Sequence, residues 1–89
     1  MANVKIPTPL RPLTNNLTSI DIDGSNVIQL IENLNDKFPG FKDKIIEENS
    51  LKHFVNIYIN GEDIRYIDSM FTEIKEGDEV SIVPAVAGG

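Results

Sequence analysis

Apolar and polar residues alternate most regularly between residues 54 and 59. Every second residue there is apolar and β-branched, namely Val55, Ile57 and Ile59, and this period of two predicts a strand with one buried face. Asn60-Gly61 follows at once, and this pair tolerates the two positive φ angles of a type I′ turn. We therefore expect residues 62–66 to fold back as a partner strand, and the hairpin to form the central antiparallel pair of a sheet.

A helical period replaces this alternation between residues 26 and 38. The apolar residues there form a single stripe, which comprises Val27, Leu30, Ile31, Leu34 and Phe38. Asn26 is a residue type that caps helix N-termini, and Gln29, three positions later, is placed to reach back to it. Pro39-Gly40 ends the pattern because proline keeps its predecessor out of the helical region. The sequence therefore predicts one amphipathic helix with one face to bury.

Weaker patterns on either side of this helix supply the remaining elements. Before it, we expect strands at 3–6 and 17–22, separated by a proline-rich stretch. After it, we expect a short helical turn within 41–49, an irregular crossover over 68–74 and a last strand at 79–83. The order predicts an α+β domain in which the helix packs across one face of a small mixed sheet. It is the element order of the β-grasp, or ubiquitin-like, fold.

Composition and charge narrow the class of protein. The chain has 89 residues, enough for one small domain, and its lack of cysteine excludes disulfides, thiolate metal sites and cysteine nucleophiles. Its net charge of −6 comes from residues 45–89, since residues 1–44 hold equal numbers of acids and bases. Such a charge repels nucleic acid; it either solvates an acidic surface or steers the chain towards a basic partner around its C-terminal end. No stretch resembles a signal peptide or a membrane span, so we expect a cytoplasmic protein without a membrane partner.

Enzyme chemistry finds little support in the sequence. His53 is the only histidine, and no serine near it forms a readable catalytic pattern. The carboxylate pairs at positions 21 and 23, 47 and 48, and 62 and 63 match no calcium-loop spacing, and no glycine-rich phosphate-binding motif is present. We therefore expect a protein that is not an enzyme, with no catalytic residue, no metal and no cofactor of its own.

The closing residues, VPAVAGG, point to a different chemical role. Pro84 should end strand pairing, which divides the chain into a domain over 1–84 and a flexible Gly-Gly tail over 85–89. At about 3.3 Å per residue the tail reaches about 16 Å, enough to enter a buried site of another protein. Gly88 and Gly89 lack a Cβ and fit a narrow tunnel, and the uncharged Val86 and Ala87 lead to them. The reactive group is then the α-carboxylate of Gly89, which becomes a good electrophile only after an ATP-using partner converts it to an acyl-adenylate.

Three segments besides the helix carry a resemblance to a known family: IPTPLRP at 6–12, FVNIYINGEDIR at 54–65 and GDEVSIVPAVAGG at 77–89. With the final Gly-Gly, they are similar to the ThiS/MoaD family of ubiquitin-like sulfur carriers over nearly the whole chain. The resemblance implies that an E1-like enzyme adenylates the terminal glycine, here Gly89, and that this residue then becomes a thiocarboxylate. Because the sequence already ends at the glycine pair, we expect no maturation cleavage.

Within the family, the proline-rich entry, the insertion at 41–53 and Pro84-Ala85 resemble the carriers of cysteine biosynthesis. That branch implies two further partners. One is a PLP-dependent cysteine synthase, which makes an aminoacrylate acceptor, and the other is a zinc metalloprotease, which releases cysteine. The tail alone does not separate this branch from a thiamine-type carrier, the small subunit of molybdopterin synthase or a ubiquitin-like protein modifier.

The strand alternation also predicts a docking face for the partner. If Val80 and Ile82 point into the core, Val83 points outward beside Tyr58 of the neighbouring strand. A half-apolar patch next to the tail is the kind of surface that protein docking uses. We expect Tyr58 and Val83 to form this patch, with isolated surface apolar residues as the alternative.

Overall fold

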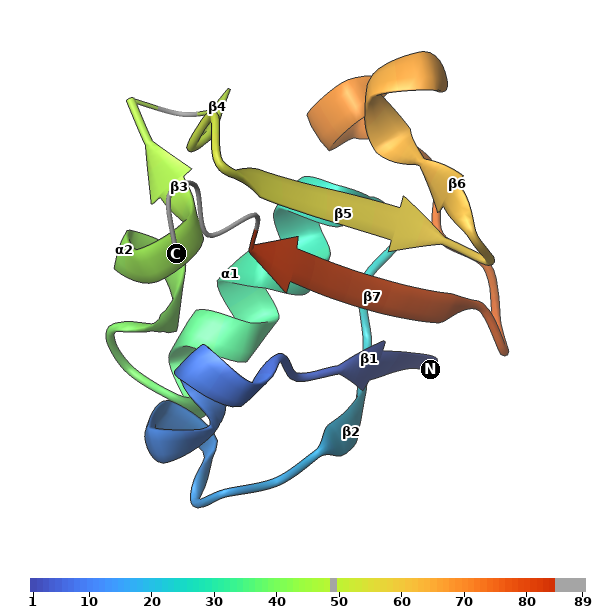
Figure 1. Ribbon diagram of the computed structural model, residues 1–89. Helices are drawn as coiled ribbons and strands as arrows, with labels where there is room; N and C mark the ends of the chain where they lie inside the picture. The colour runs from blue at the N-terminus through green and yellow to red at the C-terminus, as the bar shows by residue number, and fades with distance from the viewer. Residues whose placement is uncertain (49, 85–89) are drawn as a thin grey trace.

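A computed structural model of the chain describes residues 1–48 and 50–84. It contains a five-stranded sheet in the spatial order β2-β1-β7-β5-β6, and helix α1 (Val27–Lys37) crosses one face of this sheet (Figure 1). The strands are β1 (Ala2–Lys5), β2 (Ser19–Ile22), β5 (Val55–Ile59), β6 (Glu62–Asp63) and β7 (Glu79–Pro84). β1 and β7 run parallel, and the other neighbouring pairs are antiparallel. The predicted α+β class, a small mixed sheet with one main helix across it, is confirmed.

The core forms where the inward side chains of the strands meet the apolar stripe of α1. The helix contributes four buried residues, which are Val27, Leu30, Ile31 and Leu34. The two long neighbouring strands contribute every second residue, namely Val55, Ile57, Ile59, Val80 and Ile82. Burying each such side chain stabilises the fold by about 1.5–3 kcal/mol relative to leaving it exposed. The period of two in the strands and the helical period in α1 therefore select the residues on the two sides of one core.

The strands outside the hairpin lie close to their predicted positions. β1 and β2 match the expected strands at 3–6 and 17–22, although β2 is shorter. The proline-rich stretch between them forms the 3-10 helix η1 (Thr8–Thr14). β7 matches the expected strand at 79–83 and includes Pro84 as its last residue. No helix in the described ranges, 1–48 and 50–84, is long and apolar enough to span a membrane.

Side-chain hydrogen bonds fix the start of α1. Asn26 caps the helix as predicted, since its Oδ1 accepts a hydrogen bond from the backbone N–H of Gln29 at 2.8 Å. Gln29 reaches back one residue further than predicted, because its Oε1 accepts from the backbone N–H and the hydroxyl of Ser25, at 2.7 and 2.9 Å. Backbone hydrogen bonds from Val27 N–H to Thr72 O and from Ile74 N–H to Ser25 O hold Asn26 in an extended conformation just before the helix.

The segment after α1 is more structured than predicted. Asn35 Oδ1 accepts hydrogen bonds from the N–H groups of Gly40 and Lys42, both at 3.1 Å, and so links the end of α1 to α2 (Phe41–Ile45). α2 confirms the expected helical turn, and it packs against α1 and η1. A small hairpin of β3 (Ile46–Glu47) and β4 (Ser50–Leu51) follows. Its strands are two residues long, which is too short for a hydrophobic period to reveal them.

The hairpin after β5 is shorter than predicted and lies at the edge of the sheet. Asn60-Gly61 has φ angles of 51° and 87°, as a type I′ turn requires. The predicted strand over 62–66 is wrong beyond Asp63, because Asp63 Oδ1 accepts a hydrogen bond from the N–H of Arg65 at 2.9 Å and starts the 3-10 helix η2 (Ile64–Tyr66). The hairpin is not the central pair either, since β7 lies on the other side of β5, at the sheet centre. Another 3-10 helix, η3 (Ser69–Phe71), lies within the predicted crossover.

Asp78 ties the turn before β7 to the β5–β6 hairpin, and this predicts a pH dependence of stability. Its carboxylate accepts hydrogen bonds from the backbone N–H of Lys75 at 2.8 Å and from the side-chain amide of Asn60 at 2.9 Å. These bonds, the backbone one foremost, lower the pKa of Asp78 below its ordinary value of 3.8. A carboxyl group with a depressed pKa stabilises the folded state above its unfolded pKa and loses this contribution as pH falls through the folded value. In urea unfolding we therefore expect Asp78→Asn to be less stable than the wild type at neutral pH, with the difference shrinking below pH 3.8.

Asp36→Asn is the matched control for this prediction. Asp36 is exposed on α1 and accepts no hydrogen bond from the described residues, so its replacement should show no such convergence. If Asp78→Asn lost as much stability relative to the wild type in acid as at neutral pH, the charge of the carboxylate would not be the cause of the loss.

Candidate functional site

The tail that the sequence marks as reactive begins where β7 ends. β7 pairs with β1 on one side and β5 on the other, and its last residue, Pro84, lies opposite Val55. The pairing with β1 ends at Ser81, so β5 is the strand that lies beside this last residue, which we call the tail root. The predicted tail lies outside the described residues, and so do its functional positions, Val86, Ala87, Gly88 and Gly89.

Two arginines bind backbone carbonyls beside the tail root. Arg65 Nη2 donates a hydrogen bond to Val55 O at 2.8 Å, and Arg11 Nε donates one to Ile6 O at 3.1 Å. Ile6 directly follows β1, which runs parallel to β7 and so ends on the same side of the sheet as Pro84. In a chain with a net charge of −6, two guanidinium groups therefore flank the root.

Four of the acidic residues of segment 45–89 lie together, away from the tail root. A hollow beside the β5–β6 turn is lined by four carboxylates, those of Glu62, Asp68, Glu73 and Asp78. This hollow lies by the start of β7, whereas the tail root is at its end. Of the two interpretations of the charge, these four carboxylates therefore favour a solvated acidic surface over the steering of a basic partner to the tail.

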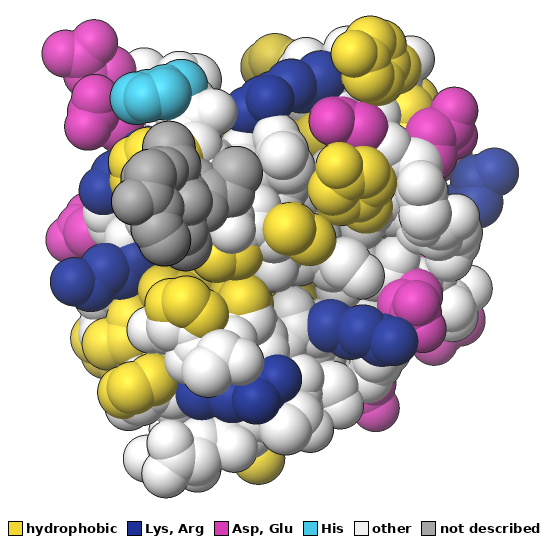
Figure 2. Space-filling model, viewed as in Figure 1, with side chains coloured by type: hydrophobic (Ala, Val, Ile, Leu, Met, Phe, Trp, Pro, Cys, Tyr) yellow, Lys and Arg dark blue, Asp and Glu magenta, His cyan; other side chains and the backbone are white. Residues whose placement is uncertain are grey.

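The open face of the sheet, opposite α1, brings the two predicted docking residues together. Val80 and Ile82 are buried as expected, so Ser81 and Val83 point to the open face. Tyr58 is the register partner of Ser81, and Val83 is two positions further along, a diagonal spacing of about 7–8 Å. Val83 is 42% exposed and Tyr58 is half-buried. Apolar side chains are visible on this face in Figure 2, among basic, acidic and uncharged ones.

The same face holds a polar atom without a partner. Asn56 is the register partner of Val83, and its Oδ1 is buried with no hydrogen-bond partner among the described residues. Such an orphaned acceptor costs about 1–3 kcal/mol.

The sole histidine, His53, lies in a small cluster with Lys52 and Phe54. Its ring meets the ring of Phe54 edge-on, with 5.5 Å between centroids, and Lys52 Nζ lies 5.9 Å from the same ring. Within residues 1–48 and 50–84, no group of three histidine or carboxylate side chains is arranged to hold a metal ion.

Comparison with known proteins places the chain in a family. The sequence model of the ThiS family matches residues 4–89. The chain belongs to the ThiS family. A curated relative, sulfur carrier protein CysO of Mycobacterium tuberculosis, is 40% identical over an alignment of 89 residues that covers 97% of this chain and 96% of the relative.

Solved structures agree with the assignment of this ThiS-family chain. A chain in the crystal structure of the Amycolatopsis orientalis BexX/CysO complex matches with a TM-score of 0.96 and 37% identity, with complete coverage of both chains. Small archaeal modifier protein 1 of Methanosarcina acetivorans matches with a TM-score of 0.85 and 33% identity, covering 99% of this chain and 95% of that one. The predicted β-grasp, ubiquitin-like fold and the predicted family are both confirmed.

Sequence reasoning missed the two arginines of this ThiS-family site. Arg65 was expected in a strand, and Arg11 lies in a stretch that the sequence marked only as rich in proline. Their positions beside the tail root depend on the sheet order, which sets β1 and β5 on either side of β7. Both residues lie in segments that carry the family resemblance, 6–12 and 54–65, but the resemblance assigned a role to neither of them.

Proposed function

We propose that this ThiS-family chain is a sulfur carrier in which an E1-like partner adenylates Gly89, which then becomes a thiocarboxylate. A carboxylate oxygen of Gly89 attacks the α-phosphorus of ATP, and pyrophosphate leaves. A hydrosulfide equivalent then attacks the acyl carbon, and AMP leaves. One carboxyl oxygen is thereby replaced by sulfur, and the partner provides the ATP and the catalytic groups.

The observation that carries this proposal is the position of β7 in the sheet. β7 is the central strand, with partners on both sides, and it ends at Pro84, five residues before the sequence ends in Gly-Gly. Those five residues span about 16 Å when extended. The domain can thus stay outside a partner enzyme and hold the tail root, while the terminal carboxylate reaches the nucleotide inside.

The experiment that tests the proposal measures the intact mass of the protein. We expect the chain, incubated with an E1-like adenylating enzyme, ATP and a sulfide source, to gain the mass difference between sulfur and oxygen. The gain should require ATP, and a chain with Gly89 deleted should not show it. A gain that persists without Gly89 would place the sulfur elsewhere and refute the proposal.

The pathway that we propose for the sulfur is cysteine biosynthesis. The support is the full-length similarity to sulfur carrier protein CysO. The further partners are then a PLP-dependent cysteine synthase and a zinc metalloprotease. Transfer of labelled sulfur from the thiocarboxylate to an aminoacrylate on the synthase would support this branch, and exclusive transfer to a molybdopterin or thiamine precursor would contradict it.

A second candidate function is covalent attachment of Gly89 to lysines of other proteins. The likeness to a small archaeal modifier protein favours it. High-molecular-weight conjugates that resist both thiols and hydroxylamine in cell extracts would support this function, because amide bonds survive both reagents.

The open face predicts how a docking defect should appear. Val83 is 42% exposed beside the tail root, and Leu17, near the β2 edge, is 40% exposed. We expect Val83→Lys to raise the KM for the carrier in the adenylation reaction about tenfold, or about 1.4 kcal/mol of lost binding, because it places a hydrated charge where Tyr58 and Val83 would contact the partner. Leu17→Lys should leave the KM unchanged. Equal effects of the two variants would remove the open face as the docking surface.

A further inference from the structure

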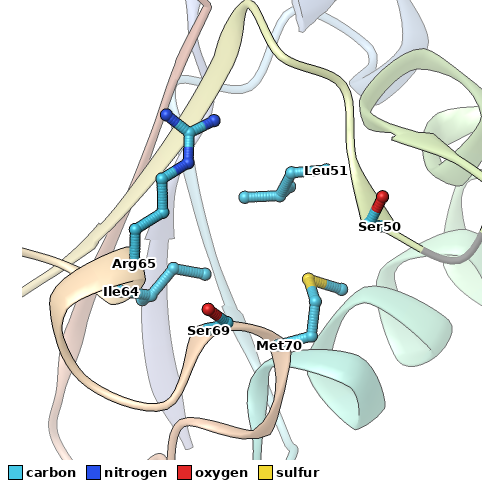
Figure 3. A pocket seen from close by; sticks show the side chains of 6 residues that line it. All are labelled: Ser50, Leu51, Ile64, Arg65, Ser69 and Met70. Atoms are coloured by element: carbon cyan, nitrogen blue, oxygen red, sulfur yellow. The ribbon is translucent and has the colours of Figure 1, made fainter.

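A small apolar pocket lies next to the tail root, on the side of β5 that faces away from β7. Six residues line it: Ser50, Leu51, Ile64, Arg65, Ser69 and Met70 (Figure 3). Its volume is about 160 Å³, several times the roughly 30 Å³ of a water molecule. In Figure 3, Leu51 from β4, Ile64 from η2 and Met70 from η3 point towards one another. The centre of the pocket is therefore apolar, and the polar side chains lie around it.

Arg65 is the charged residue at this pocket, and the shortness of β6 puts it there. If β6 continued in register, residue 66 would lie opposite Val55. Because β6 stops at Asp63, the guanidinium of Arg65 fills the empty place and donates a hydrogen bond to Val55 O at 2.8 Å. Among the described residues this is the one hydrogen bond of its side chain, and none of their ion pairs involves it. A guanidinium has five N–H donors, so most of its capacity is left for an anion.

We propose that this pocket binds the chain's own residues 85–89, with the terminal carboxylate of Gly89 paired to Arg65. Val55 is the register partner of Pro84 and the hydrogen-bond partner of Arg65, so the guanidinium lies one strand spacing, about 5 Å, beyond the strand next to the tail root. The tail reaches about 16 Å, which is more than this path requires.

The chemistry of the tail complements the pocket. Residues 85–87 are Ala, Val and Ala, which suit the apolar centre, and a planar guanidinium can bind a carboxylate through two parallel hydrogen bonds. A short tether also gives the tail an effective concentration in the millimolar range at the pocket, so weak contacts are sufficient to hold it. The pocket is thus a resting site for the end group until an activating enzyme competes for it.

This inference shares the terminal carboxylate of Gly89 with the proposed function, but it requires no partner enzyme. Docking of the tail is measured on the isolated chain, whereas sulfur transfer is measured as a mass gain. Either result can therefore fail without the other.

The test compares amide NMR spectra of the full chain with a free C-terminal carboxylate and of the same chain with a C-terminal amide. We expect the amide signals of Leu51, Ser69 and Met70, and the side-chain Nε–H of Arg65, to shift when the carboxylate is capped. The shifts should shrink at high salt, since the pair with Arg65 is screened. In Arg65→Gln, capping the carboxylate should no longer move the signals of Leu51 and Met70.

Arg11→Gln is the matched control, because Arg11 also flanks the tail root and also donates to a backbone carbonyl. In this variant the effect of capping should persist. The proposal is overturned if capping changes only signals next to Pro84, if Arg11→Gln abolishes the effect and Arg65→Gln does not, or if the effect grows with protein concentration, as it would for a tail bound by a second copy.

Discussion

Gly88→Val is expected to slow formation of the Gly89 thiocarboxylate by about 100-fold, because a β-branched side chain next to the reacting carboxyl displaces it by about 1 Å in a narrow tunnel. The domain should be unaffected, since the strands and helices that the structure describes are built from residues 2–84, and the substitution changes none of these residues. Single-turnover thiocarboxylation, followed by mass spectrometry at saturating partner enzyme, measures the effect. At saturation a docking defect no longer contributes to the rate.

The control for this prediction is Ala85→Val, which also adds bulk but lies next to the tail root. We expect it to react at close to the wild-type rate, because residue 85 remains near the mouth of the partner's site. Comparable slowing by both variants would mean that the tail tolerates no bulk anywhere, and a normal rate for Gly88→Val would mean that no narrow tunnel surrounds the reacting end.

Phe41→Ala should produce the largest loss of stability among simple core truncations. Phe41 begins α2, is completely buried and is among the largest of the fully buried side chains. Its truncation removes apolar contacts and leaves a cavity, for which about 3–5 kcal/mol is expected. Small domains have only about 5–15 kcal/mol in total, so we expect a much lower urea midpoint than that of the wild type.

Phe71→Ala provides the matched control for the stability measurement. Phe71 is 73% exposed in η3, and its truncation should change the free energy of unfolding by no more than about 0.5 kcal/mol. If Phe71→Ala were as destabilising as Phe41→Ala, the burial assigned to these two residues would be incorrect.

The elements that bury one face against the core could be predicted from the sequence. β5, β7 and α1 each carry an unbroken apolar period, and the structure buries the residues which that period selects. The end of β6 could not be predicted, because a hydrogen bond from the Arg65 N–H to the side chain of Asp63 decides it. The β3–β4 hairpin was missed for a related reason, since two residues per strand contain no period.

In the candidate site, too, some residues could be predicted from the sequence and others could not. Tyr58 and Val83 were predicted to share a face, because alternation within each strand sets the direction of its side chains. The functional roles predicted for Gly88 and Gly89 stay predictions, since these residues lie outside the described ones. Arg65 and Arg11 required the structure, because their places beside Pro84 follow from strand order and from contacts between residues far apart in sequence.

The most direct measurement is tandem mass spectrometry of the C-terminal peptide, taken from protein purified from its own cells without reducing or alkylating agents. The account predicts a fraction of this peptide in which sulfur replaces one oxygen of the Gly89 carboxyl group, and the fraction should fall when the cells are starved of sulfur. A peptide that never carries sulfur at Gly89 in sulfur-replete cells, or that is found only in amide linkage to lysines of other proteins, would contradict it.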